Sequence, residues 1–276
     1  MTLYELMLRT NHHLLCNRKP YLTDTQKIYI VKRFLSAQSS REECQRFWRS
    51  VRFPGNRDSS GRRMYPEFFI PPYNDGKKYR SILGQMPATH IFSSNLYELE
   101  IIRLLACFAP DSKDVQTILN STLARLKTTC FGYQDDGLGE CFDTSLVVLR
   151  FLAAAAPDQT DWIQSRIDVY HKYFAQKRRP WQTEWYFRLC LSELPDEIAI
   201  PELWKQQNEL YRLRTQMQTE ADHDNTEQCA LKAAILDRCI ARITYLQSIG
   251  VPICKPSYPS AKASSPSGNS PHLPFS

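Results

Sequence analysis

An internal repeat constrains the fold of this chain more than any other feature. When the sequence is aligned with itself at an offset of 47 residues, eight of the sixteen positions from 99 to 114 are identical. A looser third copy ends with Arg188, Pro195 and Asp196. The matched pairs of the first two copies are Leu99 with Leu146, Arg103 with Arg150, Leu105 with Leu152, Ala106 with Ala153, Ala109 with Ala156, Pro110 with Pro157, Asp111 with Asp158 and Asp114 with Asp161.

The repeated pattern predicts pairs of antiparallel helices. An apolar helix ends before the proline, because the ring disfavours helical geometry in the preceding residue. We expect the aspartate after the proline to cap the next helix, and the second acid to interact with that helix dipole. Units of roughly 38 to 47 residues are typical of stacked helical arrays. The predicted fold class is all-α, with αα-hairpin repeats in an irregular solenoid or bundle, HEAT-like or open α/α-toroid-like, and one long ordered loop.

Other helices are indicated by their capping signals. Thr23 with Gln26 and Ser40 with Glu43 form capping boxes, which predict a helix pair near the N-terminus. A helix from 201 to about 219 would carry its proline in the first turn. The last helix is expected from about 226 to 248, where apolar residues follow the helical period.

These segments predict one helical domain over residues 1–250, in which 95–195 hold the αα-hairpin repeats. The segment 251–276 is rich in proline and serine and lacks apolar periodicity, so we expect a disordered tail. No run of 18 apolar residues occurs in the 276-residue chain, and the N-terminal stretch contains charged residues. The sequence therefore predicts a cytoplasmic protein that does not enter a membrane.

The charge of the chain is concentrated in its first part. Residues 1–80 hold 16 lysines and arginines against 7 acids, a net charge of +9, whereas 81–276 hold 19 against 22, a net of −3. Such a basic N-terminal region attracts phosphate-bearing partners or acidic protein surfaces, or simply forms solvated helix faces. The nine cysteines form no CxxC pair and are odd in number, which argues against a disulfide framework.

The segment 53–80 is predicted to be a long ordered loop. Its prolines and glycines exclude a long helix, and its aromatic residues argue against disorder. Cations track phosphates and aromatic rings stack on bases, so the loop is a candidate site for a protein, a phosphate-bearing ligand or nucleic acid. Alternatively, its aromatic residues fill a groove between helices. The candidate binding residues are Arg57, Arg62, Arg63, Tyr65, Phe69, Tyr73, Lys77, Lys78 and Arg80.

A second candidate site is the acidic segment around residues 129–143. Four carboxylates within nine residues could provide ligands for a divalent cation or an acid and base pair, although a structural cap at a helix start is the ordinary explanation. Cys130, Cys141 and His171 have zinc-ligand chemistry, but their spacing matches no closed zinc module, so packing is preferred. We therefore expect no metal and no cofactor. The candidate catalytic residues are Asp135, Asp136, Glu140 and Asp143.

The same segment resembles a repeat of the α/α-toroid enzymes, which include the protein prenyltransferase β subunits and the terpene cyclases. The order of a glycine-rich turn followed by CFDTSLVVLRFLAAA carries the resemblance, and residues 133–136 are similar to the DxDD motif of class II cyclases. The resemblance implies that Asp135 is a proton donor. Tyr133 stands where the motif has its first aspartate, and about ten predicted helical segments fall short of the twelve that a closed toroid requires.

Because no complete catalytic constellation occurs, the sequence favours a binding or adaptor module for a protein or a phosphate-bearing partner, with nucleic acid as a further possibility. The alternative is an enzyme that uses residues 135–143 on a phosphorylated or nucleic acid substrate, with or without a divalent metal.

Overall fold

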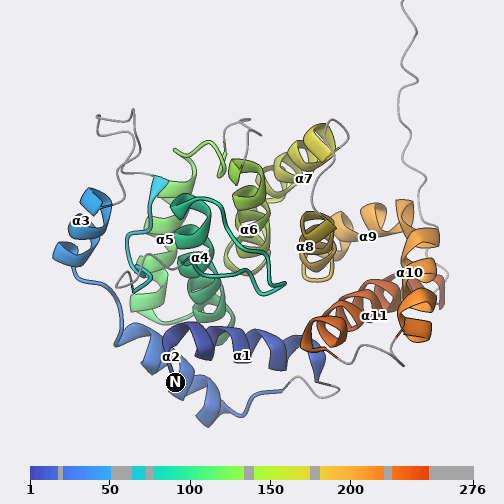
Figure 1. The fold of residues 1–276 in the computed structure, drawn as a ribbon, viewed down its shortest axis with the longest axis horizontal. Coiled ribbons are helices and arrows are strands. Elements are labelled where there is room, and N and C mark those ends of the chain that lie inside the picture. The colour runs from blue at the N-terminus through green and yellow to red at the C-terminus, as the bar shows by residue number, and fades with distance from the viewer. Residues whose placement is uncertain are drawn as a thin grey trace, which may run out of the picture.

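The computed structural model describes residues 1–17, 21–50, 64–72, 78–133, 140–174, 181–220 and 226–248. Within these ranges the chain forms eleven α-helices and no strand, which confirms the all-α class (Figure 1). The predicted tail at 251–276 lies outside the described residues. The helices are α1 (Leu3–Cys16), α2 (Asp24–Leu35), α3 (Arg41–Ser50), α4 (His90–Phe108), α5 (Lys113–Leu126), α6 (Glu140–Ala155), α7 (Thr160–Phe174), α8 (Trp181–Leu191), α9 (Asp196–Lys205), α10 (Gln207–Glu220) and α11 (Glu227–Ser248).

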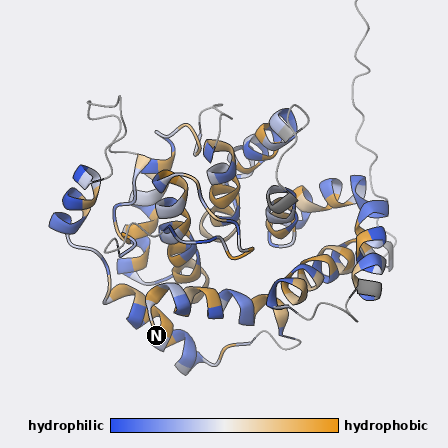
Figure 2. Ribbon diagram, viewed as in Figure 1, coloured by the Kyte–Doolittle hydropathy of each residue, from blue (hydrophilic) through white to orange (hydrophobic). Residues whose placement is uncertain are grey.

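Three helices form the centre of the molecule. Every residue of α4 from Ile91 to Ala106 is buried, and α6 is buried from Thr144 to Leu152. A helix that is buried on all sides must be surrounded by other elements. Helix α4 packs against α6, and α6 packs against α8. Figure 2 shows the contrast with α10, which is mostly hydrophilic.

The central helices belong to a closed circuit of contacts. Helix α8 packs against α11, α11 against α1, and α1 against α4, which brings together the first and last helices of the described chain. Figure 1 shows α1 running across the direction of α4 and α6. Five helices thus surround one interior. Helix α5 packs against α4, α7 against α6, and α9 against both α8 and α11. The assignment of these helix pairs as repeats stays a prediction.

The predicted capping role of the repeat aspartates is wrong. The backbone N–H of Ser112 donates to the carbonyl of Ala109, and that of Gln159 donates to the carbonyl of Ala156, at 3.1 Å in both cases. Proline and aspartate are therefore the two central residues of a turn, for which proline is well suited at the first central position. The N-cap residue of α5 is Ser112, which makes no side-chain capping bond.

The helix predicted to begin at Pro201 begins earlier. Helix α9 starts at Asp196 and contains Pro201. It ends at Lys205, and α10 begins after the single residue Gln206. The predictions nearer the N-terminus are confirmed, because Thr23 and Gln26 bond reciprocally at the start of α2. The carboxylate of Glu43 likewise accepts the backbone N–H of Ser40 at 2.7 Å.

Residues 64–72, the described middle of the predicted loop, are anchored to the central helices by one buried acid. Glu98 Oε1 accepts the backbone N–H groups of Glu67 and Phe68, each at 2.7 Å, and Oε2 pairs with Arg125 at 2.6 Å. Burial raises the pKa of Glu98, while Arg125 and the backbone amides oppose that rise. Residues 53–63 and 73–77 lie outside the described part, so the full loop stays a prediction.

Candidate functional site

Of the binding residues predicted in the 53–80 segment, the described ones either lie in the core or bond to nearby backbone carbonyls. Tyr65 and Phe69 are buried, and Tyr65 meets Phe47 edge to face with ring centroids 5.9 Å apart. Lys78 Nζ donates to the carbonyl of Ala88, and Arg80 donates to the carbonyl of Gly84 at 2.9 Å. The aromatic pair thus contributes to packing. Arg57, Arg62, Arg63, Tyr73 and Lys77 lie outside the described residues.

The described acids of the 129–143 segment accept hydrogen bonds that connect neighbouring helices. The carboxylate of Glu140, the first residue of α6, accepts the backbone N–H groups of Ala88 and of Thr89, the latter at 2.6 Å. Because Thr89 is the N-cap of α4, Glu140 joins the starts of the two central helices. Asp143 accepts the hydroxyl proton of Thr183 at 3.0 Å, which links α6 to α8. Asp135 and Asp136 lie outside the described residues.

The structure does not assemble the considered zinc ligands. His171 Nε2 lies 2.6 Å from a carboxylate oxygen of Glu202, and Lys205 pairs with the other oxygen at 2.5 Å. Cys130 and Cys141 lie close together, with their sulfur atoms 3.4 Å apart. In the described part of the chain, no three histidine, cysteine or acidic side chains are grouped in a way that could hold a metal ion.

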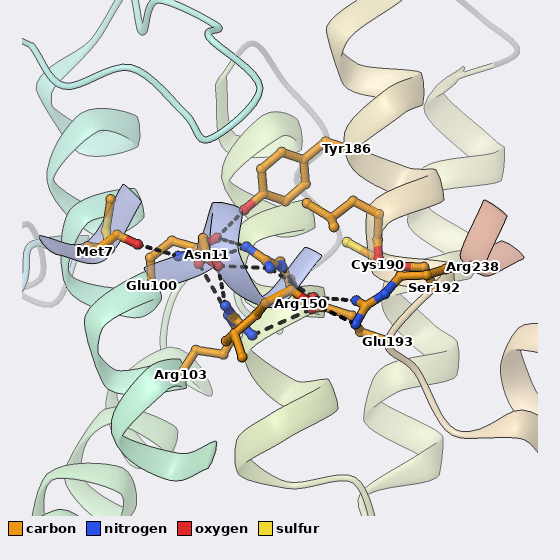
Figure 3. A network of polar contacts seen from close by, with 12 residues as sticks. Met7, Asn11, Glu100, Arg103, Arg150, Tyr186, Cys190, Ser192, Glu193 and Arg238 are labelled. Carbon is orange, nitrogen blue, oxygen red and sulfur yellow. Dashed lines mark hydrogen bonds and ion pairs between the residues drawn. The ribbon is translucent and has the colours of Figure 1, made fainter. Parts of the chain in front are cut away.

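A buried network of charged side chains occupies the interior of the five-helix circuit (Figure 3). Arg150 on α6 donates to both carboxylate oxygens of Glu100 on α4, each at 2.8 Å, and to both oxygens of Glu193 at 2.8 and 2.9 Å. Its side chain is 1% exposed, which makes this one of the most deeply buried arginines that the described chain holds. Nε and Nη2 form a bidentate pair with Glu193, whereas Nη1 alone donates to both oxygens of Glu100.

The other members of the network come from the remaining helices of the circuit. Asn11 on α1 accepts hydrogen bonds from Arg103 and, at 3.0 Å, from Arg150. Tyr186 on α8 donates its hydroxyl proton to Glu100 at 2.7 Å, and Arg238 on α11 lies 3.8 Å from Glu193. All five helices of the circuit therefore contribute a polar group to one cluster, with the 35% exposed Arg238 at its edge.

The ionisation of this cluster follows from its geometry. Burial by itself would raise the pKa of both acids, but Arg150 and Arg103 outweigh it and hold the pKa of Glu100 below its usual range. The same arginines lower the pKa of Glu193 to about 2. Burial and the nearby Glu100 carboxylate raise the pKa of Tyr186, which keeps its hydroxyl group protonated as a donor. The cluster is an ion-pair lock, with its acids charged and already bonded.

An open cleft lies along the outer face of α7. Its volume is about 660 Å³, and the buried Trp162 is one of its lining residues. Lys127 Nζ lies 5.3 Å from the centroid of the Trp162 ring, and the exposed Tyr133 meets that ring edge to face at 5.9 Å. Charges of both signs line the cleft, namely Lys127, Arg166 and Lys172 on one hand and Asp158, Asp161 and Asp168 on the other.

The turn after α5 places Tyr133 at this cleft. A Cβ atom on Gly132 would lie 2.1 Å from the carbonyl oxygen of Leu126, so only glycine fits there. The carbonyl of Gly132 accepts the indole N–H of Trp162 at 2.7 Å, and the carbonyl of Tyr133 accepts a bond from Arg166 at 2.8 Å. These bonds attach the turn to α7 and hold the two aromatic walls together.

Comparison of the chain with models of known protein families, with curated proteins and with solved structures gives no match. Among the helices of the described ranges, none combines the length and apolar character needed to cross a bilayer. Functional inference therefore depends on the geometry of the chain itself.

The sequence patterns pointed to Arg103, Arg150 and Tyr133 but not to most of the residues that contact them in the structure. Glu100 is a charged residue within an apolar run, three positions before Arg103, and such a residue signals buried pairing. Asn11 carries no comparable signal, because a lone asparagine on a helix is ordinary. The cleft could have been predicted from residues 161–172, where polar residues alternate with a tryptophan in a helical pattern.

Proposed function

We propose that this protein is a binding module and that the cleft along α7 holds a segment of a partner protein. The observation that carries the proposal is a concave surface of about 660 Å³ whose lining includes Trp162, Tyr133 and charges of both signs. Its volume is in the range of ligand sites, roughly 300 to 1,000 Å³. A cytoplasmic location and an array of helical repeats are part of this proposal.

The length of the cleft suits a short peptide segment. Its lining extends from Asp158 to Lys172, which corresponds to about 20 Å along a helix axis at 1.5 Å per residue. An extended peptide of about six residues spans that distance at roughly 3.3 Å per residue. Trp162 and Tyr133 would receive an apolar or aromatic anchor side chain, and such anchors supply most of the energy in many interfaces.

The charge pattern favours a peptide over a phosphate-rich ligand. Asp161 and Asp168 share the α7 face with Lys172, so a polyanion would meet acids beside that exposed cation. A peptide with both basic and acidic side chains pairs with each. The enzyme alternative depends on Asp135 and Asp136, and the described acids Glu140 and Asp143 already accept structural hydrogen bonds.

The proposal is tested by selecting peptides from a random heptapeptide display library on the full-length protein and measuring the affinity of a selected peptide by fluorescence anisotropy. Tyr133→Ala is expected to weaken binding by about tenfold, because it removes an exposed aromatic wall of the cleft. Tyr29→Ala on α2 is the matched control, since Tyr29 is also about half exposed and lies outside the cleft lining.

Two results would contradict the proposal. One is a selected peptide whose affinity is equal for the wild type and Tyr133→Ala. The other is displacement of that peptide by inorganic polyphosphate or single-stranded RNA with a steep salt dependence, which would show a phosphate-binding surface instead.

A further inference from the structure

The strongest feature that the proposed function leaves unused is a pair of thiols between the turn after α5 and the start of α6. Cys130 follows α5, and Cys141 is the second residue of α6. Their sulfur atoms lie 3.4 Å apart, and both side chains are half-buried. A disulfide bond has a sulfur–sulfur length of about 2.05 Å, so a closure of little more than 1 Å converts this contact into a bond.

We propose that Cys130 and Cys141 are a reversible redox site, which a disulfide-bearing thiol compound of the glutathione class oxidises to an intramolecular disulfide. This inference goes beyond the proposed binding function and does not depend on it.

The backbone on each side of the pair is held independently. The N–H of Gly132 and the carbonyl of Leu126 both bond to Thr129 Oγ1, at 3.0 and 2.9 Å, which fixes the turn that carries Cys130. On the other side, Glu140 ties the first turn of α6 to the N-cap of α4 through Thr89. Two elements that are already anchored thus present the two thiols to each other, which gives the second thiol a high effective concentration.

The reaction balances as two thiol–disulfide exchanges. One cysteine thiolate attacks oxidised glutathione, forms a mixed disulfide and releases one glutathione thiolate. The thiolate of the other cysteine then attacks the protein sulfur of that mixed disulfide and releases the second glutathione. Two cysteine thiols are oxidised, one glutathione disulfide is reduced to two thiols, and the two protons lost by the cysteines pass to the released thiolates.

Three other cysteines, namely Cys44, Cys190 and Cys239, have buried surroundings that oppose this chemistry. Burial raises the pKa of Cys44 to about 11 and that of Cys239 to about 12, which keeps both in the unreactive thiol form. Cys190 is fully buried and donates to the carbonyl of Leu146. Cys229 is half-buried like the proposed pair and provides an internal comparison.

The experiment uses the full-length protein in EDTA-containing buffers with graded ratios of reduced to oxidised glutathione, followed by alkylation, trypsin digestion and mass spectrometry. Cleavage after Lys127 and Arg150 releases one peptide that contains Cys130 and Cys141 and no other cysteine. We expect this peptide to lose two hydrogen atoms without gaining glutathione. It should reach half occupancy at a tenfold lower fraction of oxidised glutathione than the mixed disulfide at Cys229.

The variants separate an intramolecular disulfide from ordinary surface oxidation. In Cys141→Ser, the remaining Cys130 should accumulate as the mixed disulfide with glutathione, whereas Cys229→Ser should leave the internal disulfide unchanged. Oxidation of the wild type should raise the Tm by a few degrees, because a crosslink restricts the unfolded chain. The proposal is overturned if the peptide stays reduced, or carries glutathione on either cysteine, under conditions that modify Cys229.

Discussion

The ion-pair lock and the α7 cleft use the same kinds of residue with opposite results. In the lock, Arg150 is bonded to Glu100 and Glu193 at both ends of its guanidinium group, and its side chain is 1% exposed. In the cleft, Lys127 lies exposed over an aromatic ring beside acids that face solvent. The comparison teaches that charged side chains become structural where burial completes their bonds, whereas Lys127 and the acids of the cleft stay exposed to solvent.

The two regions also differ in how much their charged side chains contribute to the stability of the fold. Removing charges from water carries a large penalty, and only close pairing with complete hydrogen bonding compensates for it. Once formed, such a lock penalises any arrangement of the five helices that leaves a charge unpaired. Exposed charges contribute little to stability, so the charged side chains of the cleft can be replaced at low cost to the fold.

The largest effect should come from breaking the lock at its centre. Arg150→Met leaves Glu100 and Glu193 without their main partner, and removal of one side of a buried pair costs about 3 to 5 kcal/mol. Guanidinium chloride unfolding followed by circular dichroism measures this loss. The control is Arg212→Met, which removes an arginine whose side chain is 60% exposed and should leave the midpoint nearly unchanged. Equal midpoints for the two variants would show that the lock does not stabilise the fold.

Acid should weaken the lock in a defined pH range. The pKa of Glu193 is about 2 in the folded protein, whereas an unfolded glutamate titrates near about 4.3. Since the folded value is the lower one, this stabilisation is complete above about pH 5 and is lost as the pH falls toward 2. The shift corresponds to about 3 kcal/mol.

Glu193→Gln checks this expectation. It should lower the free energy of unfolding at pH 7 and flatten its dependence on pH between 5 and 2, as measured by denaturant unfolding at each pH. Parallel curves for the variant and the wild type would indicate that Glu193 carries no such coupling.

The smallest effect on stability is expected in the cleft. Lys127→Gln removes a cation over the Trp162 ring, an interaction worth about 0.5 to 1 kcal/mol at an exposed position. The variant should therefore unfold close to the wild-type midpoint while its affinity for a cleft-selected peptide falls. If Lys127→Gln lowered the free energy of unfolding as much as Arg150→Met, the cleft would be as important for stability as the ion-pair lock.

Local signals in the sequence predicted several features well. The Thr23 and Ser40 capping boxes and the last helix agree with the structure, because each depends on residues that are neighbours in the chain. The repeat pointed to Arg103 and Arg150, and both lie in the lock. The expected aspartate caps were wrong, because Pro110 and Asp111 form a turn that moves the helix start to a later residue.

By itself the sequence determined the all-α class, several helix boundaries and the positions of the repeated arginines, since propensity, capping and apolar periodicity act over a few residues. Only the tertiary structure decided that Asn11, Glu100 and Glu193 meet at Arg150, and that Lys127 and Tyr133 flank Trp162. These residues lie far apart along the chain or in separate elements. Their meeting depends on how the helices close around a shared interior, because packing a common core selects among the many pairings that local patterns permit.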